Sequence, residues 1–136
     1  NGFSDNRNWR LYFGNQYYEN YEVLRTDIYV LLDNNGVYII SGNWYPEINI
    51  PQNKNYDIAQ AKKSLIGYKF IYSQAAIPVE IIVNENNISQ EARKVIIPIQ
   101  KNDRIELRVA WEIYILIWGS PLYPIYVDTM TLEIVD

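Results

Sequence analysis

Apolar and polar residues alternate most regularly between Arg104 and Trp118 (RIELRVAWEIYILIW). Every odd-numbered position in this stretch is apolar, whereas the even-numbered positions are mostly charged at first and end with Tyr114, Leu116 and Trp118. Successive side chains of a strand point to opposite faces of a sheet, so the pattern predicts a strand with one fully apolar face, on which we expect Trp111 to be buried. We expect this core strand to contain a bend or bulge because of its length, and to be covered on both faces in its second half.

A β-hairpin is predicted in the first third of the chain. Tyr21–Leu32 (YEVLRTDIYVLL) is rich in residues that favour strands, and Val37–Ser41 continues in the same way. Between them lies Asp33-Asn34-Asn35-Gly36, and Asn and Gly tolerate the positive φ angles of tight hairpin turns. We therefore predict a hairpin over Tyr21–Asn43, and a short strand or turn around Trp9–Phe13.

One helix is predicted, over Tyr56–Ile66. Its apolar residues recur at helical spacing, Asn55 is placed to cap its first turn, and Asp57 lies near its start. Lys62–Lys63 lie near its end, where the helix dipole favours positive charge, and Gly67 follows. These signals agree on a single short helix.

Shorter strands are predicted around the core strand. Pro98 cannot donate a ladder hydrogen bond, so we expect an edge position or a bulge there. The order of elements predicts an α+β fold, an antiparallel β-sheet meander with one helix packed on one face, preceded by a β-hairpin. We divide the chain into 1–50, the hairpin unit, and 51–136, the helix and sheet. The short strands are Tyr68–Ser73, Pro78–Asn84, Arg93–Gln100, Leu122–Val127 and Leu132–Val135. Turns on either side of the core strand are predicted at Lys101-Asn102-Asp103 and Gly119-Ser120-Pro121.

The composition of the chain argues against nucleic-acid binding and against a membrane-spanning segment. The 136 residues carry 16 acidic and 12 basic side chains, a net charge of −4, which argues against a nucleic-acid partner. No apolar run approaches the roughly 20 residues of a membrane span. The chain starts at Asn1 without Met or a signal peptide, so we expect a trimmed or processed product.

The sequence predicts no catalytic, cofactor-binding or metal-ligating residue. It contains no His and no Cys, which excludes the usual zinc sites and every triad that depends on those residues. Phosphate-binding loops of the GxxxxGK[ST] or GxGxxG type are absent from the sequence, and so is the zinc motif HExxH. We therefore expect no cofactor and no enzymatic activity.

Carboxylates remain as candidates for chemistry, because two of them can act as acid and base in glycosidases. We favour solvated or turn positions for them, since the sequence shows no convergence of two carboxylates. Glu112 is expected to have a cross-strand Lys or Arg partner. Asp33 and Asp128 are expected to initiate turns by accepting bonds from backbone amides. The candidates for pairing are Glu80, Glu85, Glu106, Glu112 and Asp128.

Aromatic residues give the candidate binding surface. Tyr and Trp favour interfaces because they bury a large area and keep a polar tip. The alternative, which we weigh more heavily, is that they fill a thin core and cover the edges of the sheet. The residues proposed for a partner-binding surface are Trp44, Tyr45, Tyr123 and Tyr126.

Several segments together resemble known families. The helix–meander order resembles a PepSY domain, and the segment ahead of it resembles the fungalysin/thermolysin propeptide motif. Leu132 stands where PepSY domains usually have Gly, so we expect the last turn to differ. The segments with PepSY character are AQAKKSLIG (Ala59–Gly67), VIIP (Val95–Pro98), LRVAWEIYI (Leu107–Ile115) and YVDTMTLEIV (Tyr126–Val135); the propeptide-like segment is QYYENYEVLRTDIYVLLDNNGVYIISGNWYPEI (Gln16–Ile48).

The resemblance implies a PepSY/cystatin-like fold and a non-catalytic module. One implied function is a module of an exported or cell-envelope protein (secreted, periplasmic or at the bacterial surface) that binds or modulates a protein partner, as a peptidase inhibitor does. The alternative is the prodomain of a secreted zinc metallopeptidase, acting on its catalytic domain as intramolecular chaperone and inhibitor. An enzyme that uses paired carboxylates is a third class. We favour the first because of Leu132 and the aromatic, Asn-rich composition.

Overall fold

The computed structural model describes residues 8–51 and 55–135. The chain divides into two compact units, Asn1–Asn49 and Ile50–Asp136, called here the N-terminal unit and the C-terminal unit. Most of the described structure is antiparallel strand, with one short helix. No helix in the described ranges is long and apolar enough to cross a membrane.

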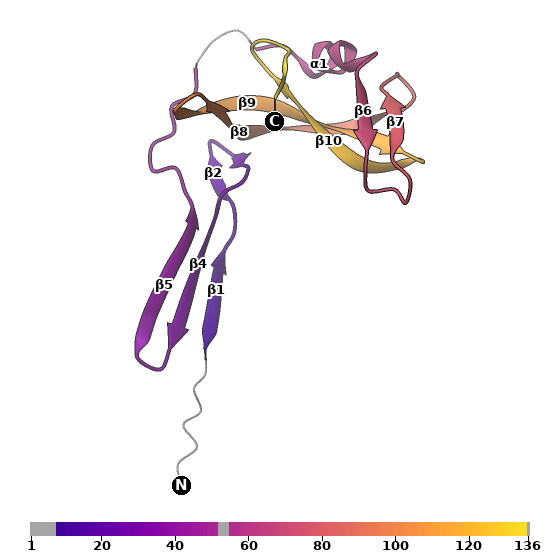
Figure 1. The fold of residues 1–136 in the computed structure, drawn as a ribbon. Coiled ribbons are helices and arrows are strands. Elements are labelled where there is room, and N and C mark those ends of the chain that lie inside the picture. Colours follow the sequence, from indigo (N-terminus) through magenta and orange to yellow (C-terminus); the bar gives the residue numbers. More distant parts are fainter. Residues whose placement is uncertain (1–7, 52–54, 136) are drawn as a thin grey trace. The chain divides into compact units, whose positions relative to one another are not determined.

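The N-terminal unit contains a three-stranded antiparallel sheet and a small hairpin (Figure 1). The sheet has the order β1-β4-β5, with β1 over Trp9–Phe13, β4 over Asp27–Asp33 and β5 over Gly36–Asn43. The hairpin joins β2 (Gln16–Tyr18) to β3 (Tyr21–Val23). The strand suggested around Trp9–Phe13 is therefore present, as β1.

The turn between β4 and β5 lies where it was predicted, and Asn35 N donates to Asp33 Oδ1 at 2.7 Å. The continuous strand expected over Tyr21–Leu32 is wrong. Arg25 has a φ of +60°, and the Thr26 hydroxyl donates to Val23 O at 2.5 Å. A left-handed residue followed by a side-chain bond to the backbone breaks the strand, and a count of alternating side chains does not reveal such a break.

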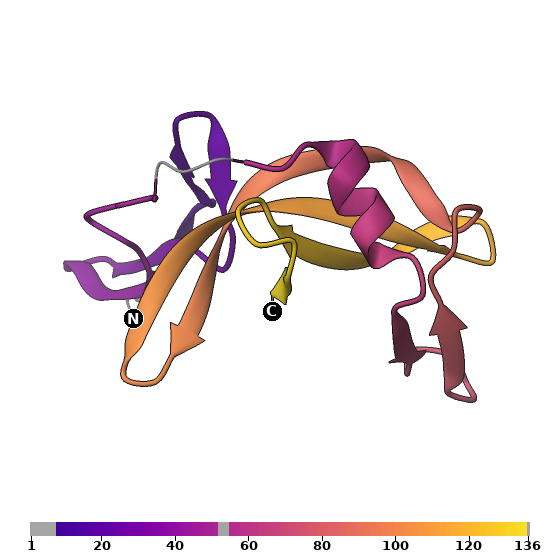
Figure 2. The same cartoon turned by 90° about the horizontal axis from the view of Figure 1, so that it is seen from above.

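The C-terminal unit is built on the predicted antiparallel meander. Its sheet runs β11-β10-β9-β8, with β8 over Ile88–Lys101, β9 over Arg104–Ile117, β10 over Ser120–Asp128 and β11 over Ile134–Val135. The core strand predicted from its alternation is β9, and the long strands of this sheet curve (Figure 2). This confirms the order of the elements in the meander.

The bulges lie in the partners of β9 rather than in β9 itself. Additional residues are accommodated in β8 between Ile88 and Ala92, and in β10 between Pro121 and Tyr123. Pro98 faces Leu107 in regular register, so the bulge suggested at Pro98 is not there. A bulge adds a residue to one strand of a pair, and either strand can carry it. The alternation within β9 could therefore not locate it.

The helix α1 covers Ile58–Leu65, shorter than predicted. Its N-cap is Asp57 rather than Asn55: Gln60 N donates to Asp57 Oδ1 at 2.8 Å, and Asp57 N donates to Gln60 Oε1 at 3.1 Å. This reciprocal capping box satisfies two amides that would otherwise lack partners. Asn55 instead accepts a bond from the Thr129 hydroxyl at 2.8 Å, a partner 74 residues away that local sequence does not reveal.

The core of the C-terminal unit lies between α1 and one face of the sheet (Figure 2). Ala61 and Leu65 of α1 are fully buried, as is Ile113 of β9. β6 (Lys69–Tyr72) and β7 (Val79–Ile82) form a separate hairpin rather than part of the meander, and they contribute to the same core. The remaining buried members of the core are Phe70, Tyr72, Val83, Ile115, Ile117, Ile125 and Val127.

The second half of β9 is not covered on both faces as expected. Tyr114 and Leu116 are partly buried, and Trp118, which follows the strand, is 73% exposed. Trp111, expected to be buried, is also only partly buried: its indole N–H donates to Tyr56 O at 3.0 Å, and Lys94 Nζ lies 5.0 Å from the ring centroid. Trp keeps a polar group that needs a partner, which favours a position at the border of a core.

Candidate functional site

The four aromatic residues predicted to form a binding surface do not form one site within either unit. Trp44 and Tyr45 belong to the N-terminal unit, whereas Tyr123 and Tyr126 lie on β10 in the C-terminal unit. Trp44 is 47% exposed, and the other three are partly buried. Only Trp44 therefore has the exposure of a contact residue.

Two of these tyrosines have structural roles. The backbone of Tyr45 is held by the Gln16 side chain: Tyr45 N donates to Gln16 Oε1 at 3.0 Å, and Gln16 Nε2 donates to Tyr45 O at 2.6 Å. Tyr123 stacks on Phe70 with ring centroids 4.1 Å apart. These positions correspond to the alternative interpretation, in which aromatic residues complete cores and hold segments together.

An apolar surface of the N-terminal unit lies on its three-stranded sheet. The register places Trp9 opposite Leu32, Leu11 opposite Val30 and Phe13 opposite Ile28, and Val30 is in turn opposite Ile40. Residues that pair directly in a sheet share a face, so these side chains form one layer. We call this layer the apolar face; it comprises Trp9, Leu11, Phe13, Ile28, Val30, Leu32, Val37 and Ile40.

The apolar face is open to solvent. Its β1 members are 46–52% exposed, Ile40 is 69% exposed, and the three residues of β4 are partly buried. None of its side chains is charged. Contiguous exposed apolar patches of several hundred Å² are rare on monomeric proteins and mark interaction sites. The apolar face is therefore the best candidate for a functional surface.

The opposite face of the same sheet is mixed. It carries Arg10 and Tyr12 from β1 and Asp27 and Tyr29 from β4, according to the register. The Arg10 guanidinium lies 4.5 Å from the centroid of the Tyr29 ring, a cation–π arrangement. The charged residues Arg10 and Asp27 distinguish this face from the apolar face, which has none.

The edge strand β5 of this sheet lacks the residues that usually discourage pairing with another chain. No residue of β5 is charged, although edge strands commonly carry charges or proline that discourage pairing with other chains. Gly42 in β5 has a φ of +146°, and a Cβ at this position would lie 2.0 Å from Asp27 O. Glycine is therefore required for the close approach of β5 to β4.

The aromatic clusters of the sequence did not predict the apolar face, although the sequence contains a signal for it. In WRLYF (Trp9–Phe13) and DIYVLLD (Asp27–Asp33) apolar residues occupy every second position. The intervening positions are also partly aromatic or aliphatic, which obscures the alternation. Only the register shows that the two sets of side chains lie on the same face.

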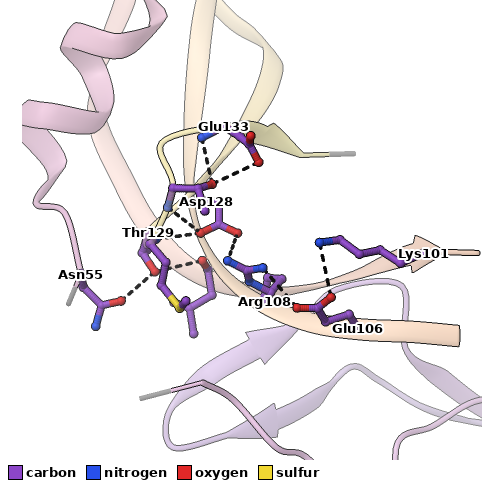
Figure 3. A network of polar contacts seen from close by, with 10 residues as sticks. Asn55, Lys101, Glu106, Arg108, Asp128, Thr129 and Glu133 are labelled. Atoms are coloured by element: carbon purple, nitrogen blue, oxygen red, sulfur yellow. Dashed lines mark hydrogen bonds and ion pairs between the residues drawn. The ribbon is translucent and has the colours of Figure 1, made fainter. Parts of the chain in front are cut away.

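A network of charged side chains links β9 to the end of β10 in the C-terminal unit (Figure 3). Arg108 Nη1 lies 3.1 Å from Glu106 Oε1, and Arg108 Nη2 lies 2.8 Å from Asp128 Oδ2, an ion pair without hydrogen-bond geometry. Arg108 and Asp128 are 8% and 2% exposed. Buried charges are tolerated when they are paired, so this network has a structural role.

Glu106 has a shifted pKa within this network. Partial burial raises the pKa of Glu106, but attraction to Lys101 and Arg108 and the hydrogen bonds that they donate outweigh this effect. Lys101 Nζ lies 3.4 Å from Glu106 Oε2. The pKa of Glu106 is therefore lower than its ordinary value, because nearby positive charges stabilise the carboxylate.

The last turn begins at Asp128, which is also a member of this network (Figure 3). Asp128 Oδ1 accepts bonds from Met130 N at 2.7 Å and Thr131 N at 3.1 Å, which confirms its predicted role in starting a turn. Leu132 has a φ of +61° and donates its N–H to Asp128 O at 3.0 Å. This left-handed conformation favours Gly. Leu132, which stands where PepSY domains usually have Gly, therefore adopts a backbone conformation that is typical of Gly.

Glu112 has the cross-strand partner that was expected. It is 4% exposed, and Arg93 Nε on the neighbouring strand donates to Glu112 Oε1 at 2.7 Å. Both line an open cavity of about 360 Å³ together with Glu91, Ala92 and Tyr114. The ion pair explains the burial of Glu112 without a catalytic role. Within residues 8–51 and 55–135, no group of three or more His, Cys, Asp or Glu residues could hold a metal ion.

Comparisons of the chain with protein-family models, with curated proteins and with solved structures find no match. The functional proposal therefore depends on the geometry of the two units, together with the resemblance of their sequence motifs.

Proposed function

We propose that the chain is a non-catalytic module of an exported or cell-envelope protein that binds and modulates a protein partner, as a peptidase inhibitor does. The apolar face of the N-terminal unit is the observation that carries this proposal. Burial of apolar surface drives most protein association, and the fully buried centre of an interface is more apolar than the remaining surface. A face without charge, with Trp9 and Phe13 among its members, suits such a centre.

The dimensions of the apolar face suit a folded partner. Three strands of about five residues cover roughly 14 by 17 Å, given the usual spacing between strands and the usual rise per residue. Polar residues lie at the ends of the strands that form this area, Asp33 at the end of β4 and Asn43 at the end of β5. An apolar centre with a polar border is the usual composition of a protein–protein interface.

A second candidate function is the prodomain of a secreted zinc metallopeptidase, with the catalytic domain as partner. The division of the chain between Asn49 and Ile50 supports this candidate, because it falls between the propeptide-like segment and the PepSY-like segments. Both candidates use a non-catalytic module that binds a protein. They differ in whether the partner belongs to the same gene product.

The test is binding to secreted zinc metallopeptidases. The purified chain is titrated against a panel of thermolysin-like and fungalysin-like catalytic domains, with hydrolysis of a fluorogenic peptide and calorimetry as readouts. We expect inhibition of at least one of them. Leu11→Lys on the apolar face should weaken binding at least about tenfold, because it buries an unpaired charge. Tyr12→Lys, on the same strand but the opposite face, is the matched control and should change binding much less.

Two results would contradict the proposal. One is the absence of both binding and inhibition across the panel at about 100 μM chain, a concentration at which even weak specific complexes form. The other is binding that Leu11→Lys leaves unchanged, which would place the contact elsewhere. Binding only to a catalytic domain encoded in the same gene product would favour the prodomain over the separate module.

A further inference from the structure

We infer that the apolar face of the N-terminal unit also binds a second copy of this chain, with the two faces packed against each other about a two-fold axis. The inference rests on the proposed function and extends it, because a second copy binds the same surface reversibly when the partner is absent. Self-association then competes with partner binding and limits the amount of free module.

Charge is the first argument for a second copy. The apolar face carries no charged side chain, so it offers nothing to a partner that is recognised by charge. An identical copy presents a surface of the same composition, and a two-fold interface uses the same patch on both subunits. The like net charge of −4 on each copy opposes association, but the contact surfaces themselves contribute no repulsion.

Geometry is the second argument. Two sheets that pack face to face lie about 10 Å apart with their inner side chains interdigitated. The N-terminal unit provides one such layer, in which Leu11 and Ile40 are 48% and 69% exposed. A second copy provides the other layer, so both apolar faces become the core of one sandwich. This covers the apolar residues of both chains in a single step.

The area predicts a weak and reversible complex. The apolar face covers roughly 14 by 17 Å in projection, and side chains roughly double the accessible area, so two copies bury about 1,000 Å² in total. Specific interfaces start at about this size, and the smallest are transient. A dimer of this strength can form at high concentration and yield to a tighter partner.

Pairing through the edge strand β5 is the main competing arrangement, because β5 is uncharged as well. Neighbouring residues of one strand distinguish the two arrangements. Ile40 lies on the apolar face, whereas Ile39 points to the opposite face. Packing between faces depends on Ile40 and not on Ile39. Pairing between edges uses the backbone and depends on both positions to a similar degree.

The experiment is sedimentation velocity on the full chain from about 1 to 500 μM, the range in which weak specific complexes dissociate. The variants are Ile40→Lys and its matched control Ile39→Lys. Ile40 and Ile39 are 69% and 42% exposed, so neither change removes core packing. Leu11→Lys and Tyr12→Lys form a second matched pair on β1. Circular dichroism and thermal melts establish that each variant is folded.

We expect the average mass of the wild-type chain to rise towards that of a dimer with concentration, and to rise further at higher salt, which screens the like charges. Ile40→Lys and Leu11→Lys should raise the dissociation constant at least about tenfold, because each buries an unpaired charge. Ile39→Lys and Tyr12→Lys should change it by less than about threefold, as is usual for surface changes outside a contact.

A wild-type chain that stays monomeric at every concentration overturns the inference, whether its apolar face stays open or is covered within the chain. Equal weakening by Ile40→Lys and Ile39→Lys also overturns it, since that result indicates edge pairing. Dimers that Ile40→Lys and Leu11→Lys leave intact would place the contact elsewhere. Peptidase binding is measured separately, by titration and inhibition, so a monomeric chain that still inhibits a peptidase would refute self-association alone.

Discussion

The two units of the chain are both rich in antiparallel strands, but they differ in how their apolar side chains are covered. In the C-terminal unit, α1 and the β6–β7 hairpin pack on one face of the long meander, and Ile113 is fully buried. In the N-terminal unit, the apolar face of β1, β4 and β5 stays partly or largely exposed. Alternation predicts that a strand has an apolar face, but it does not predict what covers that face.

The comparison also separates stability from function. A packed helix–sheet core supplies stability through burial, so substitutions in the C-terminal unit should act mainly on folding. Apolar side chains that remain exposed contribute less to folding and are available for binding. Substitutions on the apolar face should therefore act mainly on association. Three predictions test this distinction, beginning with the largest expected effect.

Truncation of a core residue should distinguish the units most strongly. Ile113→Ala should lower the free energy of unfolding by about 2–5 kcal/mol, because it removes buried surface and leaves a cavity. Leu11→Ala, at a position 48% exposed, should cost less than about 1 kcal/mol, as most exposed substitutions do. Urea denaturation followed by circular dichroism measures both. Similar costs for the two variants would show that the apolar face is buried in the folded chain.

Loss of the helix cap should have an intermediate effect. Asp57→Ala removes the acceptor for Gln60 N and should cost about 0.5–2 kcal/mol. It loosens the element that covers the sheet of the C-terminal unit, without changing the sheet itself. Asp57→Asn is the matched control, since Asn is an equally good N-cap, and it should retain most of the stability. A thermal melt of Asp57→Ala that matches the wild type would mean that the helix does not depend on this cap.

Acid should weaken the C-terminal unit through Glu106. The folded pKa of Glu106 is lowered, so its ion pairs with Lys101 and Arg108 stabilise the fold above the unfolded pKa. That contribution disappears as the pH falls through the lowered folded pKa. Glu106→Gln lacks it at every pH, so the difference in melting temperature between wild type and variant should be largest near pH 7 and vanish in acid. A difference that does not change between pH 7 and pH 3 would rule out this linkage.

Much of the C-terminal unit could be predicted because its signals are local. The alternation of β9, the helical spacing before Gly67 and the turn residues Asn102 and Gly119 each act within a few positions. The turn at Asn34–Asn35 in the N-terminal unit was predicted for the same reason. The meander followed because consecutive strands joined by short turns pair with each other.

The errors arose where distant residues decide the local structure. Asn55 was predicted to cap the helix, but Thr129 binds it, and Asp57 serves as the cap. Trp111 was predicted to be buried, but its indole N–H bonds to Tyr56 O at the border of the core. In both cases a hydrogen bond between residues far apart in the chain competes with the local preference.

The candidate site shows the same contrast between local signals and the effects of distant residues. Trp44, Tyr45, Tyr123 and Tyr126 were chosen because of their chemistry, and the structure leaves only Trp44 well exposed. The apolar face combines residues of three strands, and its members become one surface only through the pairing of β4 with β1 and β5. Residue type alone therefore suggested which side chains could bind a partner, whereas the strand register determined which side chains lie on one surface.

By itself, the sequence determined the elements that depend on neighbouring residues: the core strand β9, the short helix, most of the turns and the absence of His and Cys. The period of apolar side chains and the φ preferences of Asn and Gly act over a few residues, so they can be recognised without a structure. The tertiary structure alone decided which apolar faces are covered, where the bulges lie and how Arg108 joins Glu106 to Asp128. Burial and long-range pairing depend on the positions of residues that are distant in the chain, and those positions exist only in the folded protein.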